Sequence, residues 1–160
     1  MTDPAGISVR PAQGDDVDSI VEFNRRLALE TEDIVLERST LERGVSALLE
    51  DTDRGRYFIA LNPAGERLGQ LMITYEWSDW RNGMLWWLQS VYVIPAARRQ
   101  GVFSALFDEV RRQASADAVV CGIRLYVEDR NRHARDTYQA CGFTNAGYLV
   151  MEWMKPGEGT

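Results

Sequence analysis

The apolar positions of this 160-residue chain recur with two different periods, and each change of period marks a new element. Residues 7–10 alternate as in a short strand, and residues 17–27 carry apolar side chains at helical spacing after a turn at 14–16. A second helix is expected over residues 39–50, because Ser39 and Glu42 stand three positions apart in a capping-box pattern. The chain is therefore predicted to open with one strand and two helices.

Strand-like runs follow at residues 57–61, 68–77 and 85–94. Turn-forming residues separate the runs, and the Asn82-Gly83 pair is a strong hairpin signal. The middle of the chain is therefore predicted to be an antiparallel meander.

The second half of the chain returns to helical spacing and then alternates again. A helix is expected from residue 101 to about 115, a strand over 121–128 and a helix over 131–141 that Gly142 ends. Residues 144–154 are typical of a closing hairpin with its turn at Gly147. Strand, helix and strand in this order indicate a right-handed crossover and a parallel strand pair.

These elements predict an α/β (α+β) fold with a mixed, mostly antiparallel sheet flanked by helices. Because 160 residues make one ordinary domain, a single domain over residues 1–160 is expected.

Charge and composition narrow the class of partner. The net charge is −6, from 18 basic and 24 acidic residues, which argues against general binding of nucleic acid or anionic membranes. An acidic surface is compatible with a cationic substrate such as an amine. No apolar run approaches the roughly 20 residues needed to cross a bilayer, and the first residues lack the blocks of a signal peptide. We therefore expect a cytoplasmic protein.

Metal and disulfide chemistry are not expected. Cys121 and Cys141 lie far apart among apolar neighbours, which predicts two buried thiols in place of a disulfide framework or zinc spacing. His133 is the sole histidine, so histidine-based zinc clusters are excluded. Its arginine neighbours, Arg132 and Arg135, predict a solvated helix surface.

A phosphate-binding turn is predicted between the strand that ends near residue 94 and the helix that begins near Gly101. Such a turn leaves backbone N–H groups unpaired at the helix N-terminus, where the helix dipole adds about 0.3–1 kcal/mol per anion. Arg98 and Arg99 add positive charge, and Gly101 lets a ligand approach the backbone. The glycine patterns of nucleotide hydrolases and of dinucleotide-binding folds are absent from the sequence.

Two segments resemble the motifs of the GNAT acetyltransferase superfamily. Residues 98–102 (RRQGV) resemble its pyrophosphate-binding loop, Q/R-x-x-G-x-G/A, and residues 131–143 (NRHARDTYQACGF) resemble its N-x-x-A-x-x-x-Y-x-x-x-G-F signature. Both motifs stand in the family's order, and the resemblance covers roughly residues 85–154. One departure is Phe103, where the family has Gly or Ala. Its place on a stripe with Phe107 predicts that its ring points into the core.

The resemblance implies an enzyme that uses acetyl-CoA as acyl donor, with a fourth strand that separates from the fifth. The exposed backbone of that strand, at Val91, Tyr92 and Val93, would bind pantetheine as an added strand would. The residues implied to hold the pyrophosphate are Arg98, Arg99, Gln100, Gly101, Val102, Phe103 and Ser104.

In the second motif, the resemblance implies that Asn131 contacts the coenzyme arm and that Tyr138 protonates the departing thiolate. The spacing is compatible with both roles, because residues 131 and 138 lie on one helical stripe about 10 Å apart. The alternatives are that Asn131 is only a helix N-cap and that Tyr138 is a half-buried core aromatic.

The implied mechanism is direct attack of a neutral amine on the thioester, with backbone N–H groups polarising the carbonyl. Some family members place a glutamate base on the fourth strand, where this chain has Trp87 and Gln89. Neither Trp87 nor Gln89 is a base. The candidate bases elsewhere in the chain are Glu76, Asp79, Glu30 and Glu32. Each of these is more often a solvated surface carboxylate, and the proton could equally leave through water.

The acceptor is not readable from the sequence. Residues 76–87 (EWSDWRNGMLWW) hold four tryptophans, which would either pack across a hairpin or wall a pocket that holds a cation over indole rings. The candidate acceptor-pocket residues are Glu30, Trp77, Asp79, Trp87 and Gln89.

Three functions remain open. The first is an N-acetyltransferase acting on a small-molecule or peptide amine. The second is a non-catalytic acyl-CoA sensor, and the third is an interaction domain with a tryptophan-lined surface. The presence of Tyr138 favours the first, because a sensor needs no acid beside the sulfur. Dimers are common in the superfamily, so a homodimer is a further expectation by analogy.

Overall fold

The structure is a computed structural model that describes residues 6–157. Its residues fall into two compact units, one up to Leu125 and one from Tyr126 onward.

The first unit is built on one mixed sheet of five strands in the order β1-β2-β3-β4-β5. Neighbouring strands are antiparallel from β1 to β4, and β5 runs parallel to β4. This is the predicted fold class, and the crossover through a helix supplies the parallel pair. The strands are β1 (Ser8–Pro11), β2 (Arg56–Leu61), β3 (Arg67–Ser78), β4 (Gly83–Val93) and β5 (Val120–Arg124).

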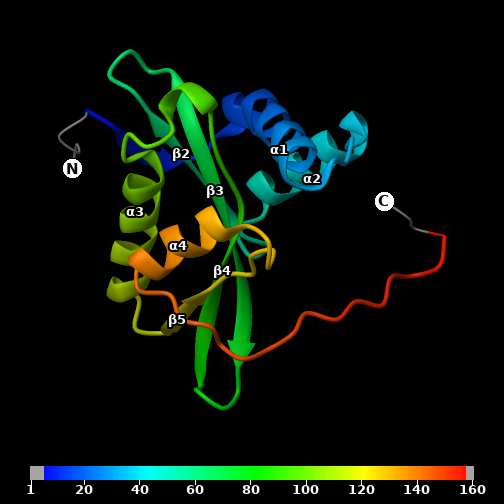
Figure 1. Ribbon diagram of the computed structural model, residues 1–160, viewed down its shortest axis with the longest axis vertical. Coiled ribbons are helices and arrows are strands. Elements are labelled where there is room, and N and C mark those ends of the chain that lie inside the picture. The colour runs from blue at the N-terminus through cyan, green and yellow to red at the C-terminus, as the bar shows by residue number, and fades with distance from the viewer. Residues whose placement is uncertain (1–5, 158–160) are drawn as a thin grey trace. The chain divides into compact units, whose positions relative to one another are not determined.

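Helices cover the two faces of this sheet (Figure 1). On one face lie α1 (Val17–Glu32), which follows a short 3-10 turn η1 (Gly14–Asp16), and α2 (Arg38–Glu50). The other face carries α3 (Val102–Ala116), which follows a second short turn, η2 (Pro95–Ala97). The buried residues beneath α1 and α2 are Ile20, Val21, Val45, Tyr57 and Ile59.

The start of α2 differs from the predicted capping box. The helix begins one residue earlier, and Glu37 is the N-cap, accepting hydrogen bonds from the N–H groups of Ser39 (2.9 Å) and Thr40 (2.6 Å). Hydrogen bonds from the side chains of Thr40 and Ser39, followed by those from their backbone N–H groups, lower the pKa of Glu37 to about 2. Glu42 instead pairs with Arg38 one turn away (2.6 Å). A capping-box pattern is too short a signal to choose between neighbouring acceptors.

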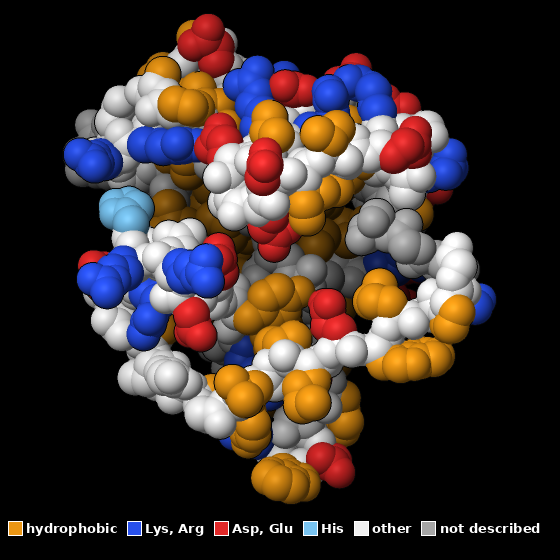
Figure 2. Space-filling model, turned by 45° about the vertical axis from the view of Figure 1, so that its right-hand side comes forward, with side chains coloured by type: hydrophobic (Ala, Val, Ile, Leu, Met, Phe, Trp, Pro, Cys, Tyr) orange, Lys and Arg blue, Asp and Glu red, His pale blue; other side chains and the backbone are white. Residues whose placement is uncertain are grey.

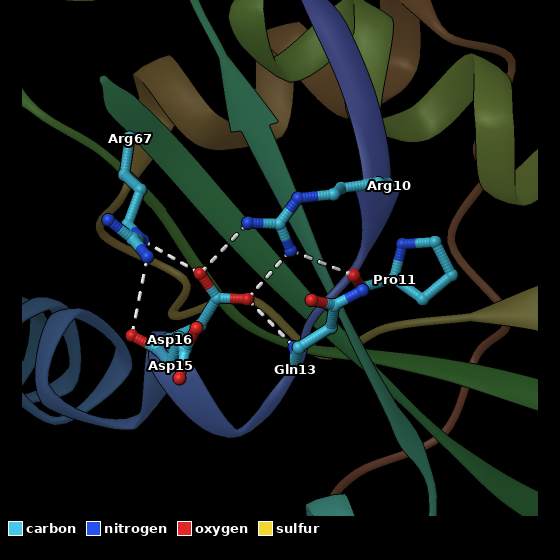
Figure 3. A network of polar contacts seen from close by, with 6 residues as sticks. All are labelled: Arg10, Pro11, Gln13, Asp15, Asp16 and Arg67. Carbon is cyan, nitrogen blue, oxygen red and sulfur yellow. Dashed lines mark hydrogen bonds and ion pairs between the residues drawn. The ribbon is translucent and has the colours of Figure 1, made fainter. Parts of the chain in front are cut away.

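A buried carboxylate ties the first strand to the centre of the sheet (Figure 3). Asp16, whose side chain is fully buried, pairs with Arg10 of β1 (2.7 Å) and Arg67 of β3 (2.7 Å). The Gln13 N–H also donates to it (2.7 Å). Burial raises the pKa of Asp16, but the hydrogen bonds from Arg10, Gln13 and Arg67 outweigh burial and lower it to about 2.

Cys121 lies on β5 and is exposed, so the prediction of two buried thiols is wrong for this residue. The β5 strand is at the edge of the described sheet, and its residues are less covered than those of the inner strands. Cys141 is half-buried.

The second unit contains α4 (Arg132–Ala140) and an extended C-terminal segment. The hairpin predicted over residues 144–154 does not form, although Asn145 accepts the Gly147 N–H in the expected turn (2.8 Å). Alternation is typical of a strand, but a strand exists only where its backbone finds a partner. Large apolar side chains of this segment are therefore exposed (Figure 2), namely Tyr148, Leu149, Val150, Met151, Trp153 and Met154.

Candidate active site

Strand β4 has an open edge beside β5. Pairing with β5 extends only from Met84 to Trp87, so the rest of β4 has no strand on that side within residues 6–157. Ile94 directs its N–H toward β3, where it bonds Leu68 (2.9 Å). By alternation, Val91 and Val93 direct their N–H and C=O groups to the open edge. This is the arrangement that an added strand or an amide-containing chain needs.

A β-bulge interrupts β4 within this edge. The two-residue step from Gln70 to Met72 on β3 stands opposite a three-residue step from Gln89 to Tyr92 on β4. The extra residue places Ser90 in the left-handed region, at φ 50°. A non-glycine residue in that conformation costs about 1–2 kcal/mol, so its surroundings must hold it there.

The loop after β4 presents a free helix end. Gly101, at φ 84°, is the N-cap of α3, and because glycine has no side chain this position does not cap the helix. The N–H groups of the first turn therefore point out of the helix, as an anion site requires. Arg99 is also left-handed, at φ 62°, and its guanidinium brings positive charge to this loop. Charge and backbone donors thus meet at the predicted pyrophosphate loop.

Other residues of this loop have different contacts. Gln100 folds back and donates to the carbonyl oxygen of Ala96 (2.8 Å). Phe103 stacks on Phe107, with ring centroids 6.0 Å apart, and is half-buried. Val102 is buried and Ser104 is exposed. The bulky residue at the sixth loop position thus has a packing partner on α3.

Arg98 is already bonded within the protein. Its Nε donates to the carbonyl of Val93 (2.9 Å), and its Nη2 donates to Glu30 at the end of α1 (2.7 Å). The Tyr92 hydroxyl also donates to Glu30 (3.0 Å), and Arg98 lies over the Tyr92 ring at 5.5 Å. Arg98, which was predicted to bind the pyrophosphate, is therefore paired with Glu30, which was predicted to line the acceptor pocket.

This cluster makes Glu30 a poor base. Burial raises the pKa of Glu30, but the hydrogen bonds from Arg98 and Tyr92 outweigh burial and lower it below its usual range. A carboxylate whose charged form is favoured in this way holds a proton less readily than an ordinary glutamate.

Trp87 and Gln89 lie near the open edge. Both point to the face of the sheet that α1 and α2 cover, because they alternate with the buried Trp86 and Leu88. Both are half-buried, and Gln89 donates to the hydroxyl of Thr74 (2.5 Å).

The remaining acceptor candidates lie toward the far end of the β3–β4 hairpin. Glu76 stands opposite Leu85, five residues or about 17 Å along the strand from Ser90, and pairs with Arg124 of β5 (2.8 Å). Trp77 lies farther along and is 54% exposed, and Asp79 caps the hairpin turn through the Trp80 N–H. The structure does not bring these residues to the phosphate loop.

The second unit holds the other two predicted site residues. Asn131 is the N-cap of α4 and accepts the N–H of Ala134 (3.1 Å), as its structural alternative predicts. Tyr138 is half-buried, with its ring 5.9 Å from that of Phe143. Burial, followed by the nearby Cys141, raises the pKa of the Tyr138 hydroxyl.

Sequence reasoning missed the polar residues beneath the bulge, Asn24 and Gln70. Asn24 interrupts the apolar stripe of α1 between Ile20 and Ala28, and this interruption is the signal that could have found it. Gln70 offers no such signal, because polar residues are ordinary on one face of a strand.

Two further features of the described part concern metal ions and membranes. Within residues 6–157, no group of three or more His, Cys, Asp or Glu side chains is placed to hold a metal ion. The helices described there are also too short or too polar to cross a membrane.

Comparison with known proteins gives a consistent result. The sequence profile of the acetyltransferase (GNAT) family matches residues 21–143. A possible acetyltransferase from Clostridium difficile 630 is 41% identical, with a TM-score of 0.87 over 93% of this chain and 97% of that one. Comparison with curated proteins finds no match.

More distant structures share the fold. One is a predicted acetyltransferase with acetyl-CoA from Clostridium acetobutylicum, 18% identical, with a TM-score of 0.74 over 91% of this chain and 96% of that one. Another is glucosamine-6-phosphate N-acetyltransferase from Arabidopsis thaliana, 13% identical, with a TM-score of 0.72 over 93% of this chain and 99% of that one.

Proposed function

Because the chain belongs to the GNAT acetyltransferase family, we propose that it transfers an acetyl group from acetyl-CoA to an amine of a small molecule or peptide. The observation that carries the proposal is the pairing of two features in the first unit. An open strand edge at Val91 and Val93 leads directly into an uncapped helix N-terminus at Gly101. The strand edge suits a chain of amides, and the helix N-terminus suits a pyrophosphate.

The residues fit acetyl-CoA at each of these features. The backbone of Val91 and Val93 would bind the pantetheine amides, and the first-turn N–H groups of α3 would bind the pyrophosphate. Arg99 supplies the positive charge, since Arg98 is held by Glu30. Ser104 is exposed in the first turn and can donate its hydroxyl to a phosphate oxygen. Asn131 is proposed to contact the coenzyme arm.

The chemical step proposed is attack of a neutral amine nitrogen on the thioester carbonyl carbon. The C–S bond breaks, the nitrogen gains the acetyl group and loses a proton, and sulfur leaves as a thiolate. Backbone N–H groups of the open edge polarise the carbonyl oxygen. Tyr138 is proposed to give its proton to the thiolate, which its raised pKa permits, because the hydroxyl stays protonated at neutral pH.

The amine proton is proposed to leave through water. Glu30 is held ionised by Arg98 and Tyr92, and Glu76 is paired with Arg124 away from the bulge. Trp87 and Gln89, beside the open edge, are proposed to wall the acceptor site. We propose that the enzyme works in the cytoplasm and as a homodimer.

The engagement of Glu30 and Glu76 by arginines also favours a second candidate, an acyl-CoA sensor of the same fold. Such a protein would bind the donor without turnover. The two functions differ in one readout, which is release of free thiol in the presence of an amine.

The test is calorimetric titration with acetyl-CoA and with coenzyme A, followed by a thiol-release assay over a panel of small-molecule and peptide amines. Micromolar binding of both ligands and thiol release with at least one amine are expected. Binding without release across the panel would favour the sensor. Absence of binding to folded protein would overturn both functions and leave the exposed tryptophans at the hairpin end as a partner surface.

A further inference from the structure

Behind the bulge of β4 lies a ring of polar side chains from four elements. Gln70 of β3 donates its Nε2 to the carbonyl oxygen of Ser90 (3.1 Å) and to Asn24 Oδ1 (3.1 Å). Asn24 of α1 donates its Nδ2 to the hydroxyl of Tyr57 on β2 (3.1 Å). The Ser90 side chain also lowers the pKa of the Tyr57 hydroxyl, so the network returns to the residue whose carbonyl oxygen Gln70 binds.

The members of this ring are deeply buried. Gln70 is 0% exposed, Tyr57 is 4% exposed and Asn24 is 6% exposed. The Oε1 atom of Gln70 is buried without a hydrogen-bond partner in the described structure. Turning the amide over would place this oxygen against Ser90 O and Asn24 Oδ1, two acceptors, so the network itself selects the orientation.

Packing alone does not call for polar groups here. The neighbouring positions on the same face are apolar, and Ile20 of α1 packs with Ile59 of β2 in the core. A buried amide with an unmade hydrogen bond is unfavourable, and apolar residues of similar shape would avoid that penalty. What an apolar residue cannot do is hold the carbonyl of Ser90, whose left-handed φ of 50° is the strained point of the strand.

We propose that Gln70, supported by Asn24 and Tyr57, is a positioning residue that holds the Ser90 bulge and so directs the N–H groups of the open β4 edge at the thioester. This inference rests on the proposed acetyl transfer. The ring acts through the backbone and touches no reacting atom. Its loss should therefore lower the rate of the chemical step more than the coenzyme affinity, because only the pantetheine contacts lie on this edge and the α3 terminus provides separate donors for the pyrophosphate.

The first variant to test is Gln70→Leu, with Ile59→Val as the control at an equally buried core position on the same face. Gln70→Leu is expected to lower kcat by about tenfold or more, because small misplacements of catalytic groups have large effects on rate. Its KM for acetyl-CoA should stay within about threefold of wild type. Ile59→Val should leave kcat within about twofold. An equal effect of both variants on kcat would overturn the proposal.

A conservative change provides the rescue. Glycine adopts positive φ without strain, so Ser90→Gly in the Gln70→Leu background removes the need to hold the bulge. Turnover of the double variant should exceed that of Gln70→Leu by about threefold or more, as coupled neighbours require. Strictly additive effects would mean that the two residues act independently. If Gln70→Leu does not fold, Tyr57→Phe is the substitute test. It removes one hydroxyl of the ring and is also expected to lower kcat.

Amide hydrogen exchange separates this inference from the proposed function. In Gln70→Leu, exchange at residues 89–93 should be at least about tenfold faster than in wild type, while α3 is unchanged. If the wild type binds no acetyl-CoA, the proposed function fails but local protection still decides whether Gln70 holds the bulge. If the wild type turns over and exchange at residues 89–93 does not change, the positioning role is wrong.

Discussion

At the scale of single residues, Asp16 is the strongest buried electrostatic link in the first unit. Its carboxylate joins Arg10 of β1 and Arg67 of β3, both within 2.7 Å (Figure 3). Its pKa of about 2 in the folded protein, against an ordinary 3.8, means that the ionised form stabilises the fold. The difference corresponds to roughly 2 kcal/mol at neutral pH.

Replacing Asp16 should remove both its contribution to the free energy of unfolding and the pH dependence of that contribution. Because the folded pKa is depressed, the contribution of Asp16 is complete above about pH 4 and is lost as the pH falls toward about 2. Asp16→Asn should lower the free energy of unfolding at neutral pH by about 3 kcal/mol, since it leaves two arginines without their partner. Urea unfolding at pH 7 and pH 3 measures both effects.

Asp15→Asn is the matched control, because Asp15 accepts from Arg67 through its backbone oxygen (3.3 Å), which the substitution keeps. It should change the unfolding free energy by less than about 0.5 kcal/mol. A small effect of Asp16→Asn at pH 7 would contradict the assignment of the network as stabilising.

Tyr138 is the residue on which the proposed acid step depends. Tyr138→Phe should lower kcat on the order of 100-fold, as expected for loss of a general acid, with coenzyme affinity within about twofold of wild type. Thiol release gives kcat, and calorimetry gives the dissociation constant. Tyr148→Phe, at an exposed tyrosine of the same unit, should leave kcat unchanged. A large loss of coenzyme affinity in Tyr138→Phe would instead assign the hydroxyl a structural role.

Contacts between side chains on distant segments were the features least predictable from the sequence. The sequence places Arg98 beside a phosphate loop, but only the fold brings it to Glu30, which lies on another element. Likewise, Gln70 and Ser90 are ordinary polar residues until the register of β3 against β4 places one behind the other. Pairings between distant segments depend on topology, which single-residue patterns do not contain.

At the scale of elements, the loop between β4 and α3 combines a free helix end with two left-handed residues. Gly101→Glu should weaken acetyl-CoA binding at least about 100-fold, because it adds bulk and a negative charge at the pyrophosphate position. Calorimetric titration measures the loss.

Gly65→Glu separates this effect from backbone strain. Gly65, at φ 80°, is as strained by a side chain as Gly101, and nothing lies within 4 Å of an added Cβ there. Both variants should lose a similar free energy of unfolding, about 1–2 kcal/mol, but Gly65→Glu should bind acetyl-CoA normally. Equal loss of binding in the two variants would show that strain, and not the loop, is responsible.

Elements with long periodic patterns were the most predictable. The stripe of α3 and the hairpin signal at Asn82-Gly83 both gave elements with bounds close to those found, α3 and the β3–β4 pair. The prediction over residues 144–154 was wrong because a strand needs a partner, and alternation carries no information about one. The bulge at Ser90 was likewise invisible, since one extra residue leaves the local pattern of a strand intact.

At the scale of the whole molecule, a long row of apolar side chains in the C-terminal segment meets solvent. Leu149, Met151 and Trp153 are 89%, 90% and 82% exposed. Exposed residues contribute little to folding, so replacing all three with serine should shift Tm by less than about 2 °C. Calorimetry or circular dichroism measures Tm.

Leu106→Ala is the control at a fully buried position of α3 and should lower Tm by about 10 °C or more. A drop of several degrees in the triple serine variant would contradict the exposed state of the segment in solution. The size of the drop would then measure how much apolar surface the segment covers.

The open edge of β4 also has a consequence for the order in which the protein folds. The β3–β4 hairpin closes over a short turn, whereas β5 joins β4 only after the chain has crossed the sheet through α3. Local pairing closes faster than pairing across a long loop. On a growing chain, the edge that would later accept acetyl-CoA is therefore formed early and lies bare. A bare strand edge is a template for other chains, so a ligand seated on it should compete with aggregation during synthesis.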